Sequence, residues 1–153
     1  MRDNPRVKPI DHSADTTASP ATVYALLRDG STWPLWSPLE RFELQSPGEF
    51  EAEGPGAVRH FGTGRAHSIE EIVELVPDRR LSYVQLEGLP LRDHRADIDI
   101  TPTAGGCRVR WRSTFKARVP GTGWIYRAAL DRFTGRCVRG FAVYAAEHDV
   151  TVS

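Results

Sequence analysis

Residues 107–118 read Cys-Arg-Val-Arg-Trp-Arg-Ser-Thr-Phe-Lys-Ala-Arg, and their side chains alternate with a period of two. Such alternation is typical of a β-strand with one dry and one wet face. The even positions are mostly basic, and a slip of one residue would bury a row of arginines, so the register is strongly constrained. The odd positions combine the large rings of Trp111 and Phe115 with the small Ser113, which indicates a surface around a space.

The composition is that of an ordinary globular protein, with 153 residues of which 40% are hydrophobic and 26% are charged. This length suits one domain, which we expect to span residues 1–153 with a disordered tail over residues 1–5. Twenty basic and twenty acidic residues give a formal net charge of zero. Nucleic-acid binding usually needs a large positive excess, so nucleic acid is not expected as a partner.

No targeting or membrane-spanning segment is recognisable in the sequence. The N-terminal residues Met1-Arg-Asp-Asn-Pro5 contain no apolar run, as a signal peptide would require. No apolar stretch approaches the roughly 20 residues of a membrane span. We therefore expect a cytoplasmic protein without stable membrane association. The cysteines, Cys107 and Cys137, are interpreted as reduced core thiols, with a disulfide or redox pair as the alternative.

Capping and turn residues divide the chain into strands and helices. A first strand is expected over residues 6–17, followed by a helix over 20–28 that Ser19 and Pro20 begin. Ser31 is expected to cap a second short helix that carries Trp33 and Trp36. Further strands are predicted at residues 39–45, 57–65, 66–76, 81–87, 92–101 and 107–118. Consecutive strands with short turns imply a curved antiparallel sheet.

The last element is a long amphipathic helix that starts near residues 120–123. Its apolar stripe recurs at intervals of three and four, at Tyr126, Leu130, Phe133, Cys137, Phe141, Tyr144 and His148. At 1.5 Å per residue the helix is about 39 Å long, and its stripe must lie on the sheet. Gly135 and Gly140 lower helix propensity, and we interpret them as marks of a close approach or a bend.

Charge complementarity predicts how strand 92–101 pairs with strand 107–118. The preferred register places Asp99 opposite Arg110, Asp97 opposite Arg112 and Asp93 opposite Lys116. A shift of two residues would oppose Arg95 to Arg112, which is repulsive. The basic row is therefore interpreted as a salt-bridged outer face and not as a nucleic-acid stripe. The same register places Ala96 opposite Ser113, and two small residues leave room for a cavity.

Four polar residues on expected dry faces are candidates for chemistry. In strand 66–76 the odd positions place Glu71 among apolar neighbours, where desolvation would raise its pKa, unless a strand irregularity turns it outward. His94 shares a face with Ala96 and is either a site residue or an ordinary core histidine. His60 and Tyr83 can orient a ligand carbonyl or hydroxyl, or can be satisfied by backbone.

The sequence shows no other recognisable catalytic or metal-binding motif. The five histidines have no metal-ligand spacing, so no metal is expected. Nucleophile-elbow, phosphate-loop and dinucleotide motifs are absent, and no cofactor is expected.

Several segments resemble START/Bet v 1-like proteins of the SRPBCC superfamily, and more narrowly its polyketide cyclase/dehydrase branch. They are Ser19-Pro-Ala-Thr-Val-Tyr-Ala-Leu-Leu-Arg-Asp29, Trp33-Pro-Leu-Trp-Ser-Pro38, Pro77-Asp-Arg-Arg-Leu-Ser-Tyr83, Gly105-Gly-Cys-Arg-Val-Arg-Trp111 and the final helix. The resemblance implies an α+β helix-grip fold. In that fold a seven-stranded curved antiparallel sheet wraps the C-terminal helix, and two short helices after the first strand close one end.

Members of this superfamily bind lipids, sterols, hormones or polyketides in an internal cavity. Some aromatase/cyclase members fold and dehydrate a poly-β-ketone chain, and they share no portable catalytic motif. Trp33 and Trp36 match the family pattern, and they either pack the short helices or touch ligand.

We therefore expect the chain to bind a small hydrophobic or aromatic molecule, lipid- or polyketide-like, between the sheet and the last helix. The alternative is a polyketide cyclase, aromatase or dehydratase, with Glu71, His94, Tyr83 and His60 as candidate catalytic groups. A chaperone-helper or assembly role would need an exposed apolar patch. Oligomeric state is left open. The expected ligand contacts are Trp33, Trp36, His60, Glu71, Tyr83, His94, Ala96, Ile98, Trp111, Ser113, Phe115, Tyr126, Leu130, Phe133 and Cys137.

Overall fold

A computed structural model describes residues 8–149, so the expected tail and the first residues of the expected first strand lie outside the described residues. The chain begins with β1 (Ile10–Thr16), α1 (Pro20–Arg28), the 3-10 turn η1 (Gly30–Thr32) and α2 (Trp33–Trp36). The remaining elements are β2 (Arg41–Ser46), β3 (Val58–Thr63), β4 (Ala66–Val76), β5 (Arg80–Glu87), β6 (Leu91–Thr103), β7 (Gly106–Ala117) and α3 (Gly123–Glu147).

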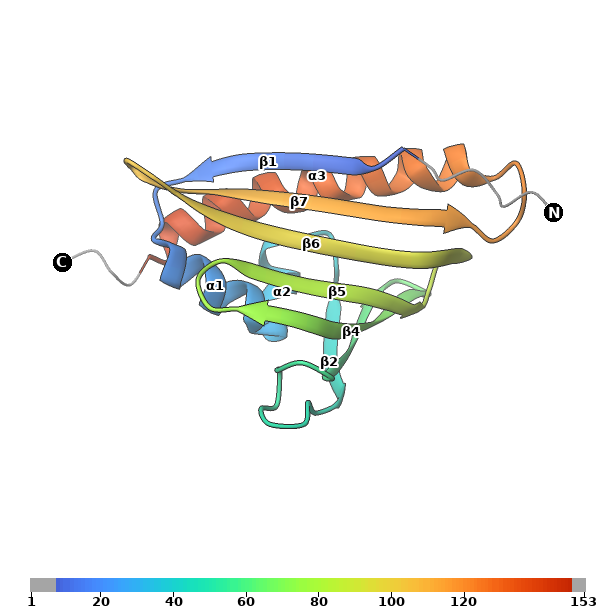
Figure 1. Ribbon diagram of the computed structural model, residues 1–153, viewed down its shortest axis with the longest axis horizontal. Coiled ribbons are helices and arrows are strands. Elements are labelled where there is room, and N and C mark those ends of the chain that lie inside the picture. Colours follow the sequence, from blue (N-terminus) through green and yellow to red (C-terminus); the bar gives the residue numbers. More distant parts are fainter. Residues whose placement is uncertain (1–7, 150–153) are drawn as a thin grey trace.

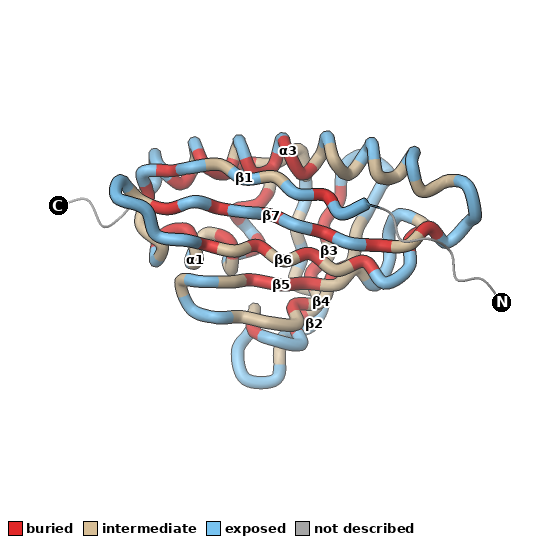
Figure 2. Tube along the Cα trace, turned by 45° about the horizontal axis from the view of Figure 1, so that its top comes forward, coloured by how far each residue is buried: buried red, intermediate tan, exposed pale blue. Residues whose placement is uncertain are grey.

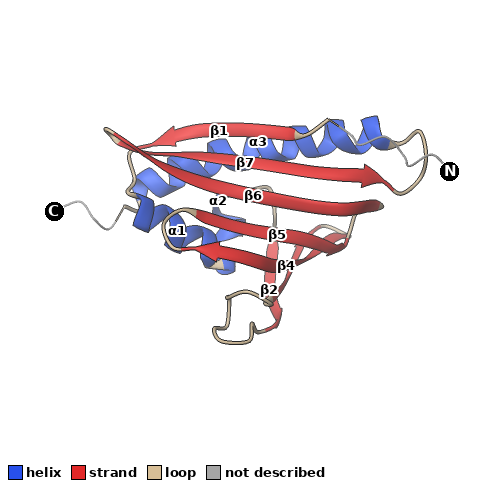
Figure 3. Cartoon of the chain, viewed as in Figure 1, coloured by secondary structure: helices blue, strands red, loops and turns tan. Residues whose placement is uncertain are grey.

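The seven strands form one antiparallel sheet in the order β1-β7-β6-β5-β4-β3-β2. The sheet is curved, and α3 packs against β1 and β7 on its inner face (Figures 1 and 3). Both α1 and α2 contact α3, near its C-terminal end. This arrangement confirms the α+β helix-grip fold that the family resemblance implies.

The alternation along residues 107–118 is confirmed in β7, where buried and exposed positions alternate (Figure 2). Its pairing with β6 also follows the predicted register over most of its length. Ala96 lies opposite Ser113, Asp97 opposite Arg112 and Asp99 opposite Arg110. The charge pattern therefore predicts the register of these two strands correctly.

The ion pairs of the outer face differ from those expected. Arg110 Nη2 lies 2.6 Å from the Asp11 carboxylate of β1, so Arg110 forms its ion pair with Asp11 and not with its cross-strand neighbour Asp99. Asp99 instead accepts from Arg80 Nε of β5 at 2.7 Å. Each strand has two neighbours, and acidic residues on β1 face the same side as the β7 arginines. The outer face is ion-paired as expected, but the partners of Arg110 and Asp99 come from the flanking strands.

The register prediction is wrong at the N-terminal end of β6. An irregularity between Arg92 and Arg95 places Arg92, not Asp93, opposite Lys116. Asp93 has a φ of 52°, in the left-handed region. Its carboxylate nevertheless lies 3.9 Å from Lys116 Nζ, so the expected charge contact persists through a bulge.

The short helices bring both tryptophans into the core. Ser19 caps α1 as expected, because its hydroxyl accepts the N–H of Thr22 at 3.2 Å. Ser31 does not cap the second helix. Asp29 accepts the N–H of Ser31 at 3.1 Å and begins η1, which continues into α2.

Glycine in α3 permits close packing at one of the two expected positions. A Cβ at Gly140 would lie 2.3 Å from the Trp36 carbonyl oxygen, so α3 touches the backbone of α2 there. At Gly135 the nearest atoms belong to side chains, the end of Arg139 at 3.0 Å and the imidazole of His12 at 3.2 Å. Side chains can move aside, whereas the α2 backbone cannot do so without repacking.

Substitution of these two glycines by alanine is therefore expected to have different effects. Gly140→Ala should lower the free energy of unfolding by about 1–3 kcal/mol through overpacking, although it gains roughly 1 kcal/mol of helix propensity. Gly135→Ala should leave stability unchanged or raise it. Urea denaturation midpoints measure both, and equal effects would contradict the close approach at Gly140.

Candidate functional site

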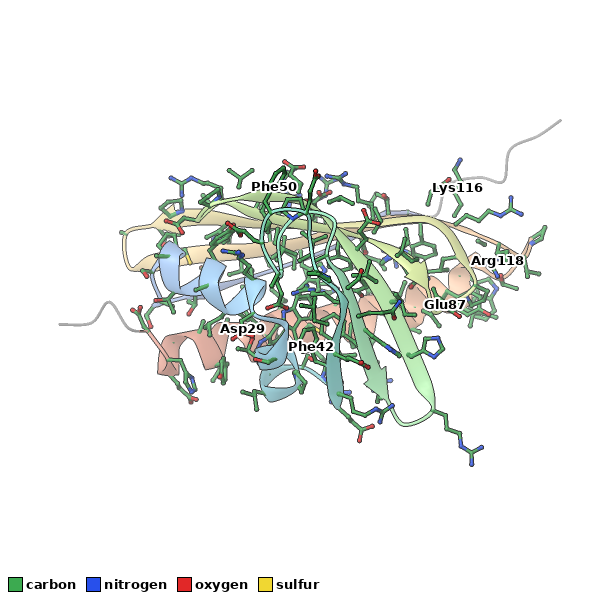
Figure 4. The ribbon with its side chains drawn as sticks, turned by 90° about the horizontal axis from the view of Figure 1, so that it is seen from below. Asp29, Phe42, Phe50, Glu87, Lys116 and Arg118 are labelled. Carbon is green, nitrogen blue, oxygen red and sulfur yellow. The ribbon has the colours of Figure 1, made fainter. Side chains whose placement is uncertain are left out.

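A cavity of about 300 Å³ lies between the sheet and α3. Side chains of the sheet and of α3 meet in the space between them (Figure 4). The apolar part of the wall comes mainly from α2, β3, β7 and α3, with Trp33, Phe61, Trp111, Leu130 and Phe133. The polar part comes mainly from β4, β5, β6, β7 and α3, with Ser68, Glu70, Tyr83, Gln85, His94, Ser113 and Thr134.

Stacked rings form the end of the cavity next to α2. The Trp33 ring stacks on Phe61 with a centroid distance of 5.0 Å and meets Trp111 edge-on at 5.4 Å. The Trp33 indole also donates to the Leu27 carbonyl at 2.9 Å, which holds its orientation. Trp36 lies behind this group and packs on Phe141 of α3 at 4.9 Å. Of the two tryptophans, Trp33 therefore lines the cavity, and Trp36 is part of the core.

The structure brings about half of the expected ligand contacts to the cavity wall. These are Trp33, Tyr83, His94, Trp111, Ser113, Leu130 and Phe133. Ala96, Ile98 and Cys137 are completely buried in the main core cluster, and Phe115 packs with Ile10, Leu91 and Tyr126 in a separate cluster. The space predicted beside Ser113 is therefore present, but its wall excludes Trp36, His60, Glu71, Ala96, Ile98, Phe115, Tyr126 and Cys137.

Of the two alternatives for Glu71, the strand irregularity that turns it outward is the one found, and Glu70 takes the interior position. Relative to β5, strand β4 contains one extra residue between Ile72 and Glu74. This bulge shifts the alternation, so Glu70 and Ile72 face inward before it and Leu75 packs against the core after it. If β4 is assumed to alternate regularly over its whole length, Glu71 is wrongly assigned to the interior.

His60 also lies on the face of the sheet that points away from the cavity. Its neighbours in β3, Arg59 and Phe61, are completely buried, whereas His60 is partly exposed. Its ring lies 5.4 Å from the ring of His67. His60 is therefore not part of the cavity wall, although its neighbour His67 is.

Glu70 is the carboxyl group of the cavity wall. It is 8% exposed, its Oε2 accepts from the Ser68 hydroxyl at 3.1 Å, and its Oε1 has no hydrogen-bond partner. Burial raises the pKa of Glu70 to about 7, although the positive charge of Arg59 and the Ser68 hydrogen bond oppose this shift. Glu70 can therefore exist in either protonation state near neutral pH.

Arg59 is a buried cation that the sequence analysis did not identify. It is the cross-strand neighbour of Glu70, and its guanidinium lies 4.8 Å from the centre of the Trp33 ring. Its Nη1 donates to the Leu27 carbonyl at 3.4 Å and lies 3.9 Å from Glu53, while Nε and Nη2 have no partner. Burial lowers the pKa of Arg59. The available signal was an arginine in the same row as Phe61, because a charge is rarely placed on a dry face.

Tyr83 and His94 add two uncharged polar groups to the same wall. Burial and the nearby negative charge of Glu70 raise the pKa of Tyr83 well above its usual value. Burial lowers the pKa of His94 to about 4, and its Nδ1 has no hydrogen-bond partner. Both groups are therefore neutral at pH 7. Within residues 8–149, no group of three or more His, Cys, Asp or Glu side chains is arranged to hold a metal ion.

The curved sheet, the long helix and the cavity between them define a helix-grip protein. Residues 9–147 match the family described as polyketide cyclase / dehydrase and lipid transport, and the chain belongs to this family. It thereby falls within the START/Bet v 1-like superfamily, as its sequence resemblance implied. No curated protein matches the chain. In the described part of the chain, no helix is both long and apolar enough to span a membrane.

Solved structures with the same fold come from diverse organisms. A Thermobifida fusca protein is 24% identical, covers 91% of this chain and 93% of its own, and has a TM-score of 0.73. Norcoclaurine synthase from Thalictrum flavum, in complex with dopamine and hydroxybenzaldehyde, is 14% identical over 94% of this chain and 89% of its own, with a TM-score of 0.70. A START superfamily protein from Mycobacterium smegmatis is 11% identical over 95% and 99%, with a TM-score of 0.68. At these identities the likeness establishes the fold alone.

The raised pKa of Glu70 predicts a measurable pH dependence of stability. The folded-state pKa of about 7 lies above the ordinary value of 4.5, so the unfolded chain releases this proton first as pH rises. Stability from Glu70 is complete below pH 4.5 and is lost by about pH 7. A shift of this size corresponds to at most about 3 kcal/mol.

Glu70→Gln should therefore gain stability relative to the wild type between about pH 5 and pH 8. Urea denaturation across this range measures the change, and Glu71→Gln on the opposite face is the matched control. An identical pH profile for Glu70→Gln and the wild type would contradict the buried carboxyl.

Proposed function

We propose that the chain binds a small hydrophobic or aromatic molecule, lipid- or polyketide-like, in the cavity between the sheet and α3. The observation that carries this proposal is a cavity of about 300 Å³ with aromatic walls and a few polar groups. Ligand sites are concave and mostly apolar in this way, and their volumes begin at roughly 300 Å³. Membership of a family described by cyclisation and lipid transport supports the proposal.

The packing of the wall also favours a pocket that exists before the ligand arrives. Trp33, Phe61 and Trp111 hold one another in place through ring contacts, and Trp33 is tied to the backbone of α1. A preformed wall lowers the ordering cost of binding. The cytoplasmic location expected from the sequence stays a prediction.

Filling the cavity should abolish binding. Ser113→Phe places a ring at the cavity wall, whereas Thr114→Phe places the same ring on the exposed face of β7. We expect the fluorescence of N-phenyl-1-naphthylamine to rise with the wild type and with Thr114→Phe, and to rise far less with Ser113→Phe. Circular dichroism checks that both variants fold. Equal fluorescence with both variants would place the probe outside the cavity.

A second candidate function, catalysis on a polyketide-like substrate, is favoured by the protonation state of Glu70. A group with a pKa of about 7 is suited to accept and return a proton at neutral pH. Tyr83 and His94 lie on the same wall and can donate hydrogen bonds to a substrate carbonyl. Norcoclaurine synthase is an enzyme with this fold, so the fold is compatible with catalysis.

The reaction that this arrangement suits is an intramolecular aldol condensation. Glu70 would remove a proton from a carbon between two carbonyls, and the resulting enolate would form a bond to a third carbonyl of the same chain. Glu70 would return this proton to the alkoxide oxygen, which gives a hydroxyl group. Glu70 would then remove the remaining proton from the attacking carbon and pass it to the departing hydroxide, so that one water molecule leaves and a carbon–carbon double bond forms in the ring.

Catalysis predicts a specific loss of rate. Glu70→Gln should slow turnover of a poly-β-ketone thioester by roughly 100- to 10,000-fold, while Glu71→Gln should retain wild-type turnover. Mass spectrometry of the cyclised product measures the rates. Absence of turnover by the wild type, or full activity of Glu70→Gln, would leave ligand binding as the function.

A further inference from the structure

The cavity wall contains two buried polar side chains whose hydrogen-bonding capacity is not used. Glu70 and His94 are each more than nine-tenths buried and line the cavity. Glu70 Oε1 and His94 Nδ1 have no hydrogen-bond partner. Buried polar groups are almost always hydrogen-bonded, so each exception calls for an explanation. A bound molecule that hydrogen-bonds to the wall supplies one.

The charges around the cavity favour a neutral occupant. The carboxylate of Glu70 already has a buried cation beside it, the guanidinium of its cross-strand neighbour Arg59. The negative charge of Glu70 is therefore already compensated by Arg59, and a cationic ligand is not needed to neutralise it. An anionic ligand, such as a fatty-acid carboxylate, would face Glu70 in the low-dielectric interior, and like charges there disfavour each other. Arg59 is not part of the cavity wall, because Trp33 and Phe61 lie between.

The unused atoms favour a hydrogen-bond donor on that neutral molecule. Above about pH 7 Glu70 is mainly ionised, and an ionised carboxylate only accepts hydrogen bonds, so there it needs a donor from the ligand. Ketones, esters and ethers have no donor, whereas a hydroxyl group has one. The neutral imidazole of His94 and the hydroxyls of Tyr83, Ser113 and Thr134 can each donate or accept, so they tolerate further oxygen atoms on the ligand.

We propose that the cavity selects a neutral aromatic molecule bearing a hydroxyl group that donates a hydrogen bond to the Glu70 carboxylate. This inference rests on the proposed function, because it specifies the ligand of the same cavity. It distinguishes hydroxylated aromatic molecules from fatty acids, which are apolar enough to enter but carry a negative charge. Glu70 is the residue that determines specificity.

Three naphthalenes of similar size test the proposal by displacing N-phenyl-1-naphthylamine at about pH 8. The probes are 2-naphthol, 2-methoxynaphthalene and 2-naphthoate, which present a donor, an acceptor and a negative charge. We expect 2-naphthol to bind roughly 10-fold or more tightly than either other probe, because hydrogen bonds to charged groups are strong. In Glu70→Leu the preference of 2-naphthol over 2-methoxynaphthalene should fall to about one, and in the control Glu71→Leu it should persist.

The outcomes separate the two proposals. If 2-methoxynaphthalene or 2-naphthoate binds as well as 2-naphthol, or if Glu70→Leu keeps the preference, hydroxyl selection is overturned and hydrophobic binding stands. If none of the naphthalenes or the fluorescent probe binds, the proposed function itself fails. If Glu70→Leu does not fold, the relative affinities of the three probes for the wild type still decide whether the cavity selects a hydroxyl group.

Discussion

Anchorage of α3 at both ends is the constraint on which the rest of the structure depends. Its C-terminal half is buried in the main core through Cys137, Val138 and Phe141, and Gly140 lets it touch the α2 backbone. Its N-terminal half packs through Tyr126 and Leu130 on the smaller cluster of Ile10, Leu91 and Phe115. Phe133 and Thr134, which lie between these anchors, face the cavity together with Leu130. The helix is straight and the sheet is concave, so the two elements separate between the anchors (Figure 1). The cavity occupies the gap between them.

Glu70, the carboxyl group of the cavity wall, has the buried cation Arg59 as its cross-strand neighbour. Arg59 and Glu70 sit side by side on β3 and β4, and neither uses all its hydrogen-bonding atoms. Removing two charges from water is costly, and a buried pair of this kind is weak evidence for stability. The position of Glu70 in the wall of an aromatic cavity is easier to explain by an interaction with a ligand than by a contribution to stability. Both proposed functions use the same group, because the Glu70 carboxylate can accept a hydrogen bond from a bound hydroxyl or a proton from a substrate carbon.

Most of the fold was predictable because its signals are local or pairwise. The period of two over residues 107–118, the Ser19 cap and the apolar stripe from Tyr126 to Tyr144 each depend on a short stretch of chain. His148, which the stripe was expected to include, is exposed and follows the last residue of the helix. The β6–β7 register follows from charges on two consecutive strands, and the structure confirms it at Asp97 and Asp99. About a third of the cavity wall follows from these elements, because strand alternation and the helix stripe select Tyr83, His94, Trp111, Ser113, Leu130 and Phe133.

The sequence alone thus defines the buried faces of β7 and α3 and the family that the chain resembles, since burial of apolar area is encoded in spacing. Tertiary structure alone decides the chemistry of the site. The bulge in β4 selects Glu70 over Glu71, and the two strands beside β7 and β6 decide that Arg110 pairs with Asp11 and Asp99 with Arg80. Arg59 acquires its role only when β3 places it beside Glu70 and under Trp33. These outcomes depend on neighbours that are distant in the chain. The local pattern of apolar residues does not show where a strand contains an extra residue or which buried atom lacks a hydrogen-bond partner.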